Sequence, residues 1–318
     1  MIGLPLELSC AIERELAAIS LNQLKKASVE LTEHYAQGRG IETSLHRFAY
    51  IAARLPATYS VASHVFQWLP LEESTSLLDI GAGVGSLAWA AAAAFPHLQR
   101  VTLMERDPEL LRLGQRLAHT HLSFLNLIWK QADVTREVTF PDHDITVISY
   151  MLNELPPLNQ LNVVERAYAA TKKFLILIEP GTPQGFELIL RARERLLNLG
   201  AHLIAPCPHQ APCPLLSAFK EGKDWCHFSV RLPRGKSHKQ AKNADLAYED
   251  EKYTYLIVSP QDYPSSENRI IRPPLTRSGH VVLDVCTQEG TLERQVVSKK
   301  DKSLYPRARK SAWGDKWP

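Results

Sequence analysis

The residues best suited to chemistry are four cysteines in the last third of the chain. Cys207, Cys213 and Cys226 fall within twenty residues, and Cys286 follows sixty residues later. Prolines beside Cys207 and Cys213 stiffen the loop that carries them. Rigid thiolates are the ligands that a soft metal centre requires, and Cys286 can complete a four-thiolate set. The clustering therefore favours metal ligation over disulfides.

Two kinds of metal centre accept four cysteines. A tetrahedral zinc site is one and a 4Fe-4S cluster is the other. His209 or His227 could replace a sulfur in a zinc site. The C-x2-C pairs of zinc ribbons are missing, which favours the cluster, and isolated buried thiols remain the structural alternative. We expect the fifth cysteine, Cys10, to lie in the core of an N-terminal helix.

A glycine-rich turn is the second feature with chemical meaning. The apolar run 77–80 leads into Gly81, Gly83 and Gly85, and an alanine-rich segment follows at 86–94. Glycines between a strand and a helix let the backbone turn tightly and approach a ligand closely. No Gly-Lys-Ser/Thr follows, which disfavours a phosphate-binding P-loop. Ser86 stands where a dinucleotide site would have Gly or Ala, which weakens a nicotinamide site.

Acidic residues stand at the ends of the strands around this turn. Glu105 ends a second apolar run, where a carboxylate can accept hydrogen bonds from both ribose hydroxyls of a nucleoside cofactor. Asp133 follows a third run, where an adenine ring would lie. The set resembles the pattern of class I S-adenosylmethionine-dependent methyltransferases. By that resemblance Asp79, Gly81, Gly83 and Gly85 surround the methionine moiety, Glu105 the ribose and Asp133 the adenine edge. Ordinary turn residues are the alternative, most of all for Asp133.

Three further residues are candidates for the acceptor side of such a site. Asn153 and Glu154 follow the fourth apolar run, and Glu179 ends the fifth. Asn153 and Glu154 could orient a methyl acceptor or cap the next helix. Glu179 could act as a base. The segment lacks the Asn/Asp-Pro-Pro-aromatic motif of enzymes that methylate exocyclic amines. The sequence therefore does not identify the acceptor atom.

The elements that must position these residues alternate along the chain. Apolar runs near 77–80, 101–105, 125–130, 144–150 and 174–179 alternate with amphipathic segments. Such alternation predicts a parallel sheet covered by helices. The expected fold is α/β, with a Rossmann-like class I methyltransferase sheet, an N-terminal helical region and a C-terminal β-rich extension that bears the cysteines. The expected parts are residues 1–70, residues 71–200, and residues 201–318 with the metal-binding insertion and a basic tail.

The positive charge of the chain lies near its C-terminal end. The net charge is +3, and residues 217–318 hold 19 Lys and Arg against 13 Asp and Glu. This asymmetry suggests a polyanionic partner, with solvated surface charge as the alternative. Tyr305 and Trp313 interleave with the tail cations and could stack on unpaired bases, unless the tail packs on its own domain. The candidate RNA-binding residues are Arg231, Arg234, Lys236, Lys239, Arg307, Arg309 and Lys310.

The chain contains no long uncharged apolar run, and no basic segment precedes an apolar one near Met1. We therefore expect a soluble, cytoplasmic protein without membrane contact, and a monomer.

Several segments together resemble a known family, the methyltransferase-like proteins associated with the mitochondrial small ribosomal subunit and their bacterial and archaeal relatives. The segments are Arg54 to Tyr59, the glycine turn, Ser149 to Leu155, Glu179 to Pro183, the Cys-Pro-His and Asp-Trp-Cys-His-Phe-Ser stretches, and Tyr305 to Trp317.

The resemblance implies an S-adenosylmethionine-binding, methyltransferase-like protein that works with small-subunit ribosomal RNA in ribosome assembly or translation. It also implies a 4Fe-4S cluster held by Cys207, Cys213, Cys226 and Cys286. The chain would then be an S-adenosylmethionine-dependent methyltransferase, or a non-catalytic RNA-binding assembly factor built on the same fold.

Overall fold

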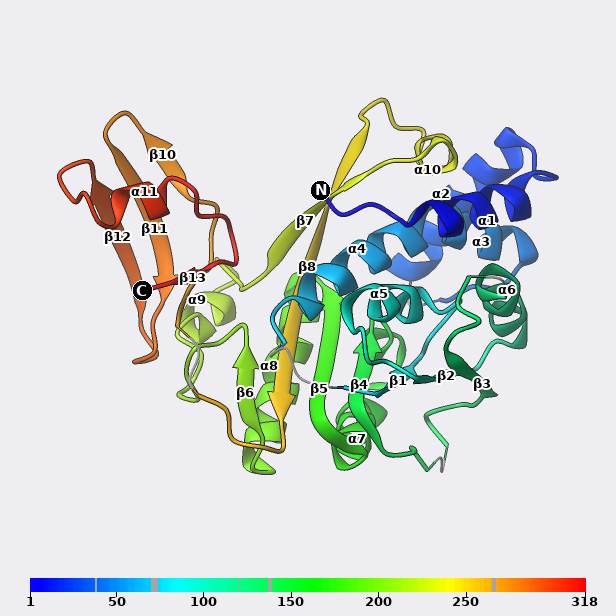
Figure 1. Ribbon diagram of the computed structural model, residues 1–318, viewed down its shortest axis with the longest axis horizontal. Coiled ribbons are helices and arrows are strands. Elements are labelled where there is room, and N and C mark those ends of the chain that lie inside the picture. Colours follow the sequence, from blue (N-terminus) through cyan, green and yellow to red (C-terminus); the bar gives the residue numbers. More distant parts are fainter. Residues whose placement is uncertain (38, 70–73, 120, 137–138, 265–266) are drawn as a thin grey trace. The chain divides into compact units, whose positions relative to one another are not determined.

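The computed structural model describes residues 1–37, 39–69, 74–119, 121–136, 139–264 and 267–318. The chain divides into two compact units, traced in Figure 1. The first comprises Met1–Ala170 and Val230–Glu251, and the second comprises Thr171–Ser229 and Lys252–Pro318. The boundary expected at residues 70 and 71 falls on residues that lie outside the described ones.

The first unit begins with helices and continues with parallel strands. Its strand order is β3-β2-β1-β4, all parallel. Helix α4 packs on α5, and α1 packs on α6. Its elements are α1 (Leu6–Leu16), α2 (Leu21–Ala36), α3 (Ser44–Ala49), the π-helix η1 (Tyr50–Arg54), α4 (Leu55–Phe66), β1 (Ser76–Ile80), α5 (Ser86–Ala94), β2 (Arg100–Glu105), α6 (Pro108–Ala118), β3 (Asn126–Gln131), β4 (His143–Ser149), the 3-10 turn η2 (Leu152–Glu154), α7 (Pro157–Ala169) and α10 (Lys236–Ala241).

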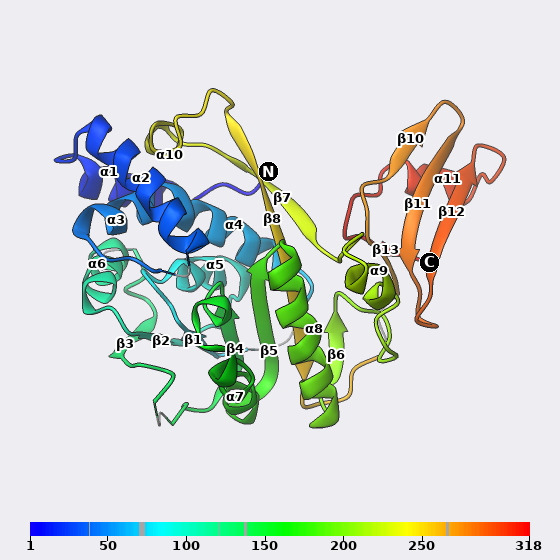
Figure 2. The ribbon, with the colours of Figure 1, turned by 180° about the vertical axis from the view of Figure 1, so that it is seen from behind.

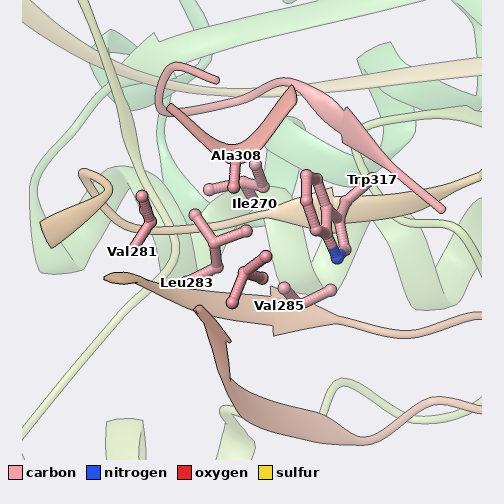
Figure 3. Close-up of a cluster of buried hydrophobic side chains, with 7 residues drawn as sticks. Ile270, Val281, Leu283, Val285, Ala308 and Trp317 are labelled. Atoms are coloured by element: carbon pink, nitrogen blue, oxygen red, sulfur yellow. The ribbon is translucent and has the colours of Figure 1, made fainter. Parts of the chain in front are cut away.

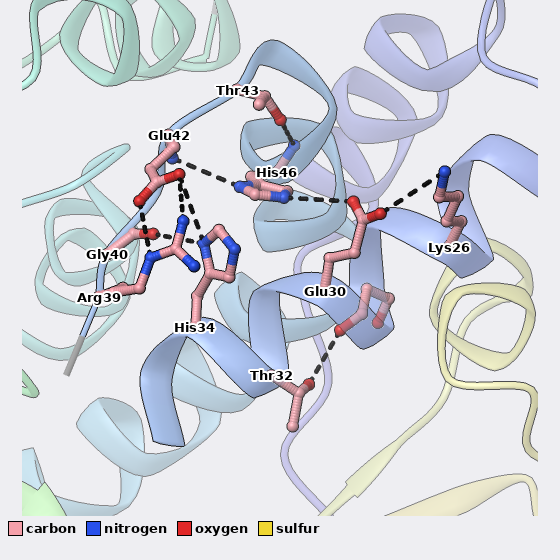
Figure 4. Close-up of polar contacts among 10 residues, drawn as sticks. Lys26, Glu30, Thr32, His34, Arg39, Gly40, Glu42, Thr43 and His46 are labelled. Carbon is pink, nitrogen blue, oxygen red and sulfur yellow. Dashed lines mark hydrogen bonds and ion pairs between the residues drawn. The ribbon is translucent and has the colours of Figure 1, made fainter. Parts of the chain in front are cut away.

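Polar contacts fix the N-terminal helices to one another. The hydroxyl of Thr43 accepts the backbone N–H of His46 and so caps α3. The buried His46 ring lies 3.5 Å from Glu30 of α2, and the His34 ring meets it edge to face (Figure 4). These contacts hold the segment between α2 and α3 in place. Gly40, on that segment, lies beside Glu154.

The second unit combines a piece of α/β structure with a small antiparallel sheet. Strand β8 lies between β5 and β6 and is antiparallel to both. Figure 2 shows α8 against β5. The elements are β5 (Thr171–Pro180), α8 (Pro183–Asn198), β6 (His202–Ala205), α9 (Leu216–Lys220), β9 (Asn268–Ile270), β10 (Leu275–Arg277), β11 (His280–Cys286), β12 (Leu292–Ser298), α11 (Tyr305–Ala308) and β13 (Lys316–Trp317); β7 (Phe228–Pro233) and β8 (Tyr248–Ser259) each belong partly to both units.

The C-terminal tail is part of the core of the small sheet. Trp317 is 1% exposed and donates from Nε1 to Oε1 of Gln295 at 2.8 Å. Figure 3 shows it among the side chains of β9 and β11. Tyr305 packs against the same cluster, and the Trp313 ring lies against His227. Of the two readings of the tail aromatics, packing on their own domain is therefore the one that the structure shows.

The fold class is the one that the sequence predicts. It is mixed α/β with a Rossmann-like class I methyltransferase arrangement, because 3-2-1-4 parallel order is followed in the second unit by β5-β8-β6 with β8 reversed. The antiparallel C-terminal sheet is present and carries Cys286. No helix in the described part of the chain has the length and apolar character needed to cross a membrane.

Candidate functional site

The glycine turn has the backbone that only glycine adopts readily. Gly81 and Gly83 have φ angles of +77° and +56°, in the left-handed region. A Cβ atom on Gly81 would lie 2.6 Å from Cγ of Met151, and one on Gly83 would lie 3.1 Å from the hydroxyl of Tyr50. The turn therefore requires glycine both for its conformation and for the close approach of these two side chains.

Glu105 holds this turn against the end of β2. Its Oε2 accepts the backbone N–H of Gly83 at 2.9 Å, and its Oε1 accepts that of Asp107 at 2.8 Å. Asp107 caps α6 and pairs with Arg47 of α3 at 2.7 Å. The carboxylate predicted to bind a ribose is thus already bonded within the loop, and its role toward a ribose stays a prediction.

Asp79 is a buried carboxyl group without a hydrogen-bond partner. It is 0% exposed, and neither carboxyl oxygen has a partner among the described residues. Burial, and then the charge of Glu105, raise its pKa to about 8. A charged group buried without compensation costs free energy, and it is relieved by a proton or by a cation. Asp79 is therefore suited to a ligand that brings positive charge.

Glu154 and Tyr50 are two further titratable groups near the glycine turn. Desolvation, and then Glu105, raise the pKa of Glu154 to about 7, although its side chain still reaches water. Arg106 opposes this rise. Burial raises the pKa of Tyr50 above its usual range, and the charges of Glu105 and Glu154 raise it more. The phenol therefore stays protonated. The charge of Glu105 thus acts on both Asp79 and Glu154 near the glycine turn.

Asp133 makes a local turn. Its Oδ1 accepts the backbone N–H of Thr135 at 3.0 Å and the Thr135 hydroxyl at 2.7 Å. The hydrogen bonds from Thr135 lower the pKa of Asp133, and Arg136 lies 3.5 Å away. The turn reading accounts for these contacts, and contact with an adenine edge stays a prediction.

The acceptor-side candidates lie in different settings. Asn153 and Glu154 form part of η2, just after β4, and Asn153 is exposed. Tyr150, at the end of β4, has a φ of +57°, a strained value for a non-glycine residue that is typical of functional sites. Glu179 is fully buried in β5 of the second unit. The catalytic roles of Asn153, Glu154 and Glu179 stay predictions.

The structure brings the four predicted metal ligands together in the second unit. Cys207, Cys213, Cys226 and Cys286 are all free of disulfides, and all four line one cavity of about 40 Å³. Cys286 ends β11, whereas the other three lie in the segment between β6 and β7. Cys10 is exposed on α1, so its expected place in the core is wrong.

The thiols around this cavity are strongly desolvated. Burial, and then Cys207, raise the pKa of Cys213 to about 11 and that of Cys286 to about 12. The pKa of Cys226 is raised for the same reasons. Nε2 of His209 lies 3.4 Å from the sulfur of Cys286. Within the residues that the structure describes, no three His, Cys, Asp or Glu side chains converge as the ligands of a single ion.

The candidate RNA-binding cations fall into two groups. Arg231 pairs with Asp250, Arg234 with Glu249 and Arg307 with Glu267, so their charges are partly offset. The other four form no ion pair with any described residue. They are Lys236, Lys239, Arg309 and Lys310.

Sequence reasoning missed the residues that cover or line the two sites. Tyr50 and Met151 lie over the glycine turn, and Arg193 and Arg269 line the cysteine cavity. Tyr50 begins a π-helix, a local irregularity that is frequent at functional sites but has no periodicity to reveal it. The two arginines are distant in sequence from the cysteines, so no spacing pattern identifies them.

Several curated proteins are similar to the chain. The human "Ribosome assembly protein METTL17, mitochondrial" is 27% identical over 96% of the chain and 68% of its own length. "Rsm22-cox11 tandem protein 2, mitochondrial" of Schizosaccharomyces pombe is 28% identical over 85% of the chain. The "Ribosome assembly protein RSM22, mitochondrial" of Saccharomyces cerevisiae is 28% identical over 45%. The chain spans only 43% and 38% of the two yeast proteins.

Two solved structures that are similar to the chain are methyltransferases by name. Magnesium protoporphyrin IX methyltransferase from Synechocystis PCC 6803 with bound SAH covers 72% of the chain and 93% of its own, at 14% identity and a TM-score of 0.43. Precorrin-6y C5,15-methyltransferase from Geobacter metallireducens GS-15 covers 63% and 86%, at 17% identity and 0.41. These scores are low, and the strand order is what defines the fold.

A family model described as "Mitochondrial small ribosomal subunit Rsm22" matches residues 44–318. The predicted cytoplasmic location is wrong, because this family and the three relatives named above are described as mitochondrial. The match includes the glycine turn and all four cavity cysteines. The chain therefore belongs to the Rsm22 family of the mitochondrial small ribosomal subunit.

Proposed function

We propose that the chain is an S-adenosylmethionine-binding, 4Fe-4S methyltransferase-like protein that acts on or with small-subunit ribosomal RNA in ribosome assembly. The family and the name of the human relative support the ribosomal part of this proposal. The observation that carries the cofactor part is the buried Asp79, whose carboxyl oxygens have no partner among the described residues.

S-adenosylmethionine fits the charge of the glycine-turn site. The cofactor brings a sulfonium and an ammonium group, and a bound cation favours the ionised forms of Asp79 and Glu154, whose pKa values are raised in its absence. In this proposal Asp79 and the glycines lie around the methionine moiety, Glu105 exchanges its backbone bonds for the ribose hydroxyls, and Asp133 lies at the adenine edge. Methyl transfer from a sulfonium needs mainly alignment, which Asn153 and Glu154 would provide for the acceptor. Glu179 is proposed as a base.

A 4Fe-4S cluster fits the cysteine cavity better than a single ion does. Four thiols line one cavity, and the four iron atoms of a cluster would each take one of them. Cys207, Cys213, Cys226 and Cys286 would hold it. When bound, it supplies a covalent link between the segment after β6 and strand β11, and a one-electron centre. Zinc is the alternative, with His209 replacing one sulfur.

The first test measures cofactor binding by calorimetry. We expect the wild-type protein to bind S-adenosylmethionine and Asp79→Asn to bind it at least tenfold more weakly, since an amide cannot ionise to meet the cationic groups of the cofactor. Asp142→Asn changes an exposed acid of the same unit and should bind like the wild type. Equal affinity of the wild type and Asp79→Asn would contradict the proposed site.

The second test measures iron and acid-labile sulfide in anaerobically purified protein. We expect both in the wild type and their loss in Cys213→Ser. Cys10→Ser replaces an exposed cysteine that does not line the cavity, so it should keep the full content. Stoichiometric zinc without sulfide would contradict the cluster and show that the cavity binds zinc.

A non-catalytic RNA-binding assembly factor is the second candidate function. The contacts that favour it are those of Tyr50 and Met151 over the glycine turn, and the turn that already occupies Asp133. The two candidates differ in the transfer of labelled methyl groups to small-subunit RNA. Transfer by the wild type that Gly83→Arg abolishes supports the enzyme, and cofactor binding without transfer supports the assembly factor.

A further inference from the structure

Arg193 is a buried cation beside the four cysteines. It lies on α8, is 6% exposed, and lines the same cavity as all four thiols. Its Nη2 donates to the carbonyl oxygens of His209 at 3.0 Å and Ala211 at 2.8 Å. Its Nε is buried and has no hydrogen-bond partner among the described residues. Among the described residues, the hydrogen-bond partners of the guanidinium group are therefore neutral carbonyl groups.

The cavity has positive charge on more than one side. Arg269 is 1% exposed and also lines it, donating from Nε to the carbonyl of Pro206 at 3.1 Å and from Nη1 to that of Gly314 at 2.9 Å. The described residues that line the cavity include no Asp or Glu. Burying a cation such as Arg193 without an anion is costly. The cavity is thus prepared for a group of net negative charge.

A thiolate-bound cluster has that charge. Four thiolates bring more negative charge than the iron-sulfide core offsets, and reduction by one electron adds to the surplus. We propose that Arg193 supplies the buried positive charge that stabilises this anionic centre and raises its reduction potential. The proposal rests on the cluster proposed above, and it assigns to Arg193 a role in tuning the cluster rather than in binding it.

A purely structural role for Arg193 makes different predictions. Its two hydrogen bonds hold the segment between Cys207 and Cys213. If only these bonds matter, Arg193→Gln and Arg193→Lys should both lose cluster, and any cluster that remains should keep its potential. If the charge matters, Arg193→Lys should resemble the wild type and Arg193→Gln should not.

The test is a potentiometric titration of the whole protein with dithionite as electron donor, with the reduced cluster followed by electron paramagnetic resonance. We expect Arg193→Gln to shift the reduction equilibrium at least tenfold toward the oxidised form, which is about 59 mV for one electron. Arg193→Lys should recover most of the shift. Arg195→Gln, an exposed change two residues along α8, should leave the potential unchanged.

Each outcome decides the matter. Loss of the cluster in Arg193→Gln but not in Arg193→Lys also supports the charge role. Loss in both variants, or retained cluster at an unchanged potential in Arg193→Gln, overturns it while the cluster itself stands. Wild-type protein without iron and sulfide overturns the proposed cluster and this inference together, and the metal analysis identifies that case before any titration.

Discussion

The glycine-turn site and the cysteine cavity differ in the sign of the charge that each buries. Around the turn, Asp79 is buried without a partner, and Glu105 and Glu154 add negative charge. Around the cavity, Arg193 and Arg269 are buried and no described acid lines the wall. Asp79 avoids the cost of a buried charge by keeping a proton until a cation can replace it, whereas Arg193 keeps its charge with no Asp or Glu among the described residues of the cavity wall. The two sites therefore point to ligands of opposite charge.

The largest effect should come from removing the tryptophan at the core of the small sheet. Trp317→Ala deletes a side chain that is 1% exposed, at a cost of about 3–5 kcal/mol. We expect lower stability in urea and loss of iron, because β11 carries Cys286, while binding of S-adenosylmethionine persists. Leu158→Ala, at an exposed position, serves as control. Equal loss of iron and of S-adenosylmethionine binding would show that the two sites do not fold independently.

A second effect is expected from the pH dependence of the buried acid. The folded-state pKa of Asp79 is raised to about 8, so the folded protein keeps a proton that the unfolded chain releases near pH 4. This acid therefore makes stability fall as pH rises from about 4 to about 8. Asp79→Asn should remove the part of this pH-dependent loss of stability that Asp79 causes. Unfolding measured without ligand at pH 5 and pH 8 checks it, and an identical slope in both proteins would refute it.

The glycine turn offers a still smaller change. Gly83→Ala places a side chain at a φ of +56° and 3.1 Å from the Tyr50 hydroxyl, which should cost about 1–2 kcal/mol. Gly235→Ala has open space and a φ of −66°, so it should be neutral or slightly stabilising. Thermal unfolding compares the two. A neutral Gly83→Ala would mean that the turn can adopt another conformation.

The smallest effect concerns the surface cations. Removing Arg309 or Lys310, which pair with no described acid, should weaken binding to small-subunit RNA and lower the salt dependence by about one unit per cation. Arg231→Ala removes a cation already paired with Asp250 and should change the slope less. Filter binding over a salt series distinguishes them. An equal change of the slope in all three variants would show that pairing with an acid does not decide which cations contact the RNA.

The sequence predicts best what depends on local pattern. The strand before the glycine turn, the helix after it and the acid at Glu105 follow from periodicity and turn chemistry, and the structure has them at those places. The grouping of the four cysteines also follows from spacing and residue type.

Long-range pairing is what the sequence does not reveal. Strand β8 pairs with β5 and β6, although 67 residues separate it from β5 and 42 from β6. Its apolar run resembles that of any other short strand. The sequence identifies the tail as basic and leaves open whether it packs on its own domain, and the structure shows Trp317 buried where the tail pairs with β9. Arg193 and Arg269 lie beside the thiols only because α8 and β9 pack there.

The interleaved course of the chain bears on the order in which the protein is made. Cys207, Cys213 and Cys226 precede β8, and Cys286 follows it. A nascent chain that has emerged only as far as residue 251 contains all of the first unit but three of the four thiols. Such a chain can complete the glycine-turn site first. The fourth ligand arrives only with β11, so any metal centre in the cavity is necessarily completed late in synthesis.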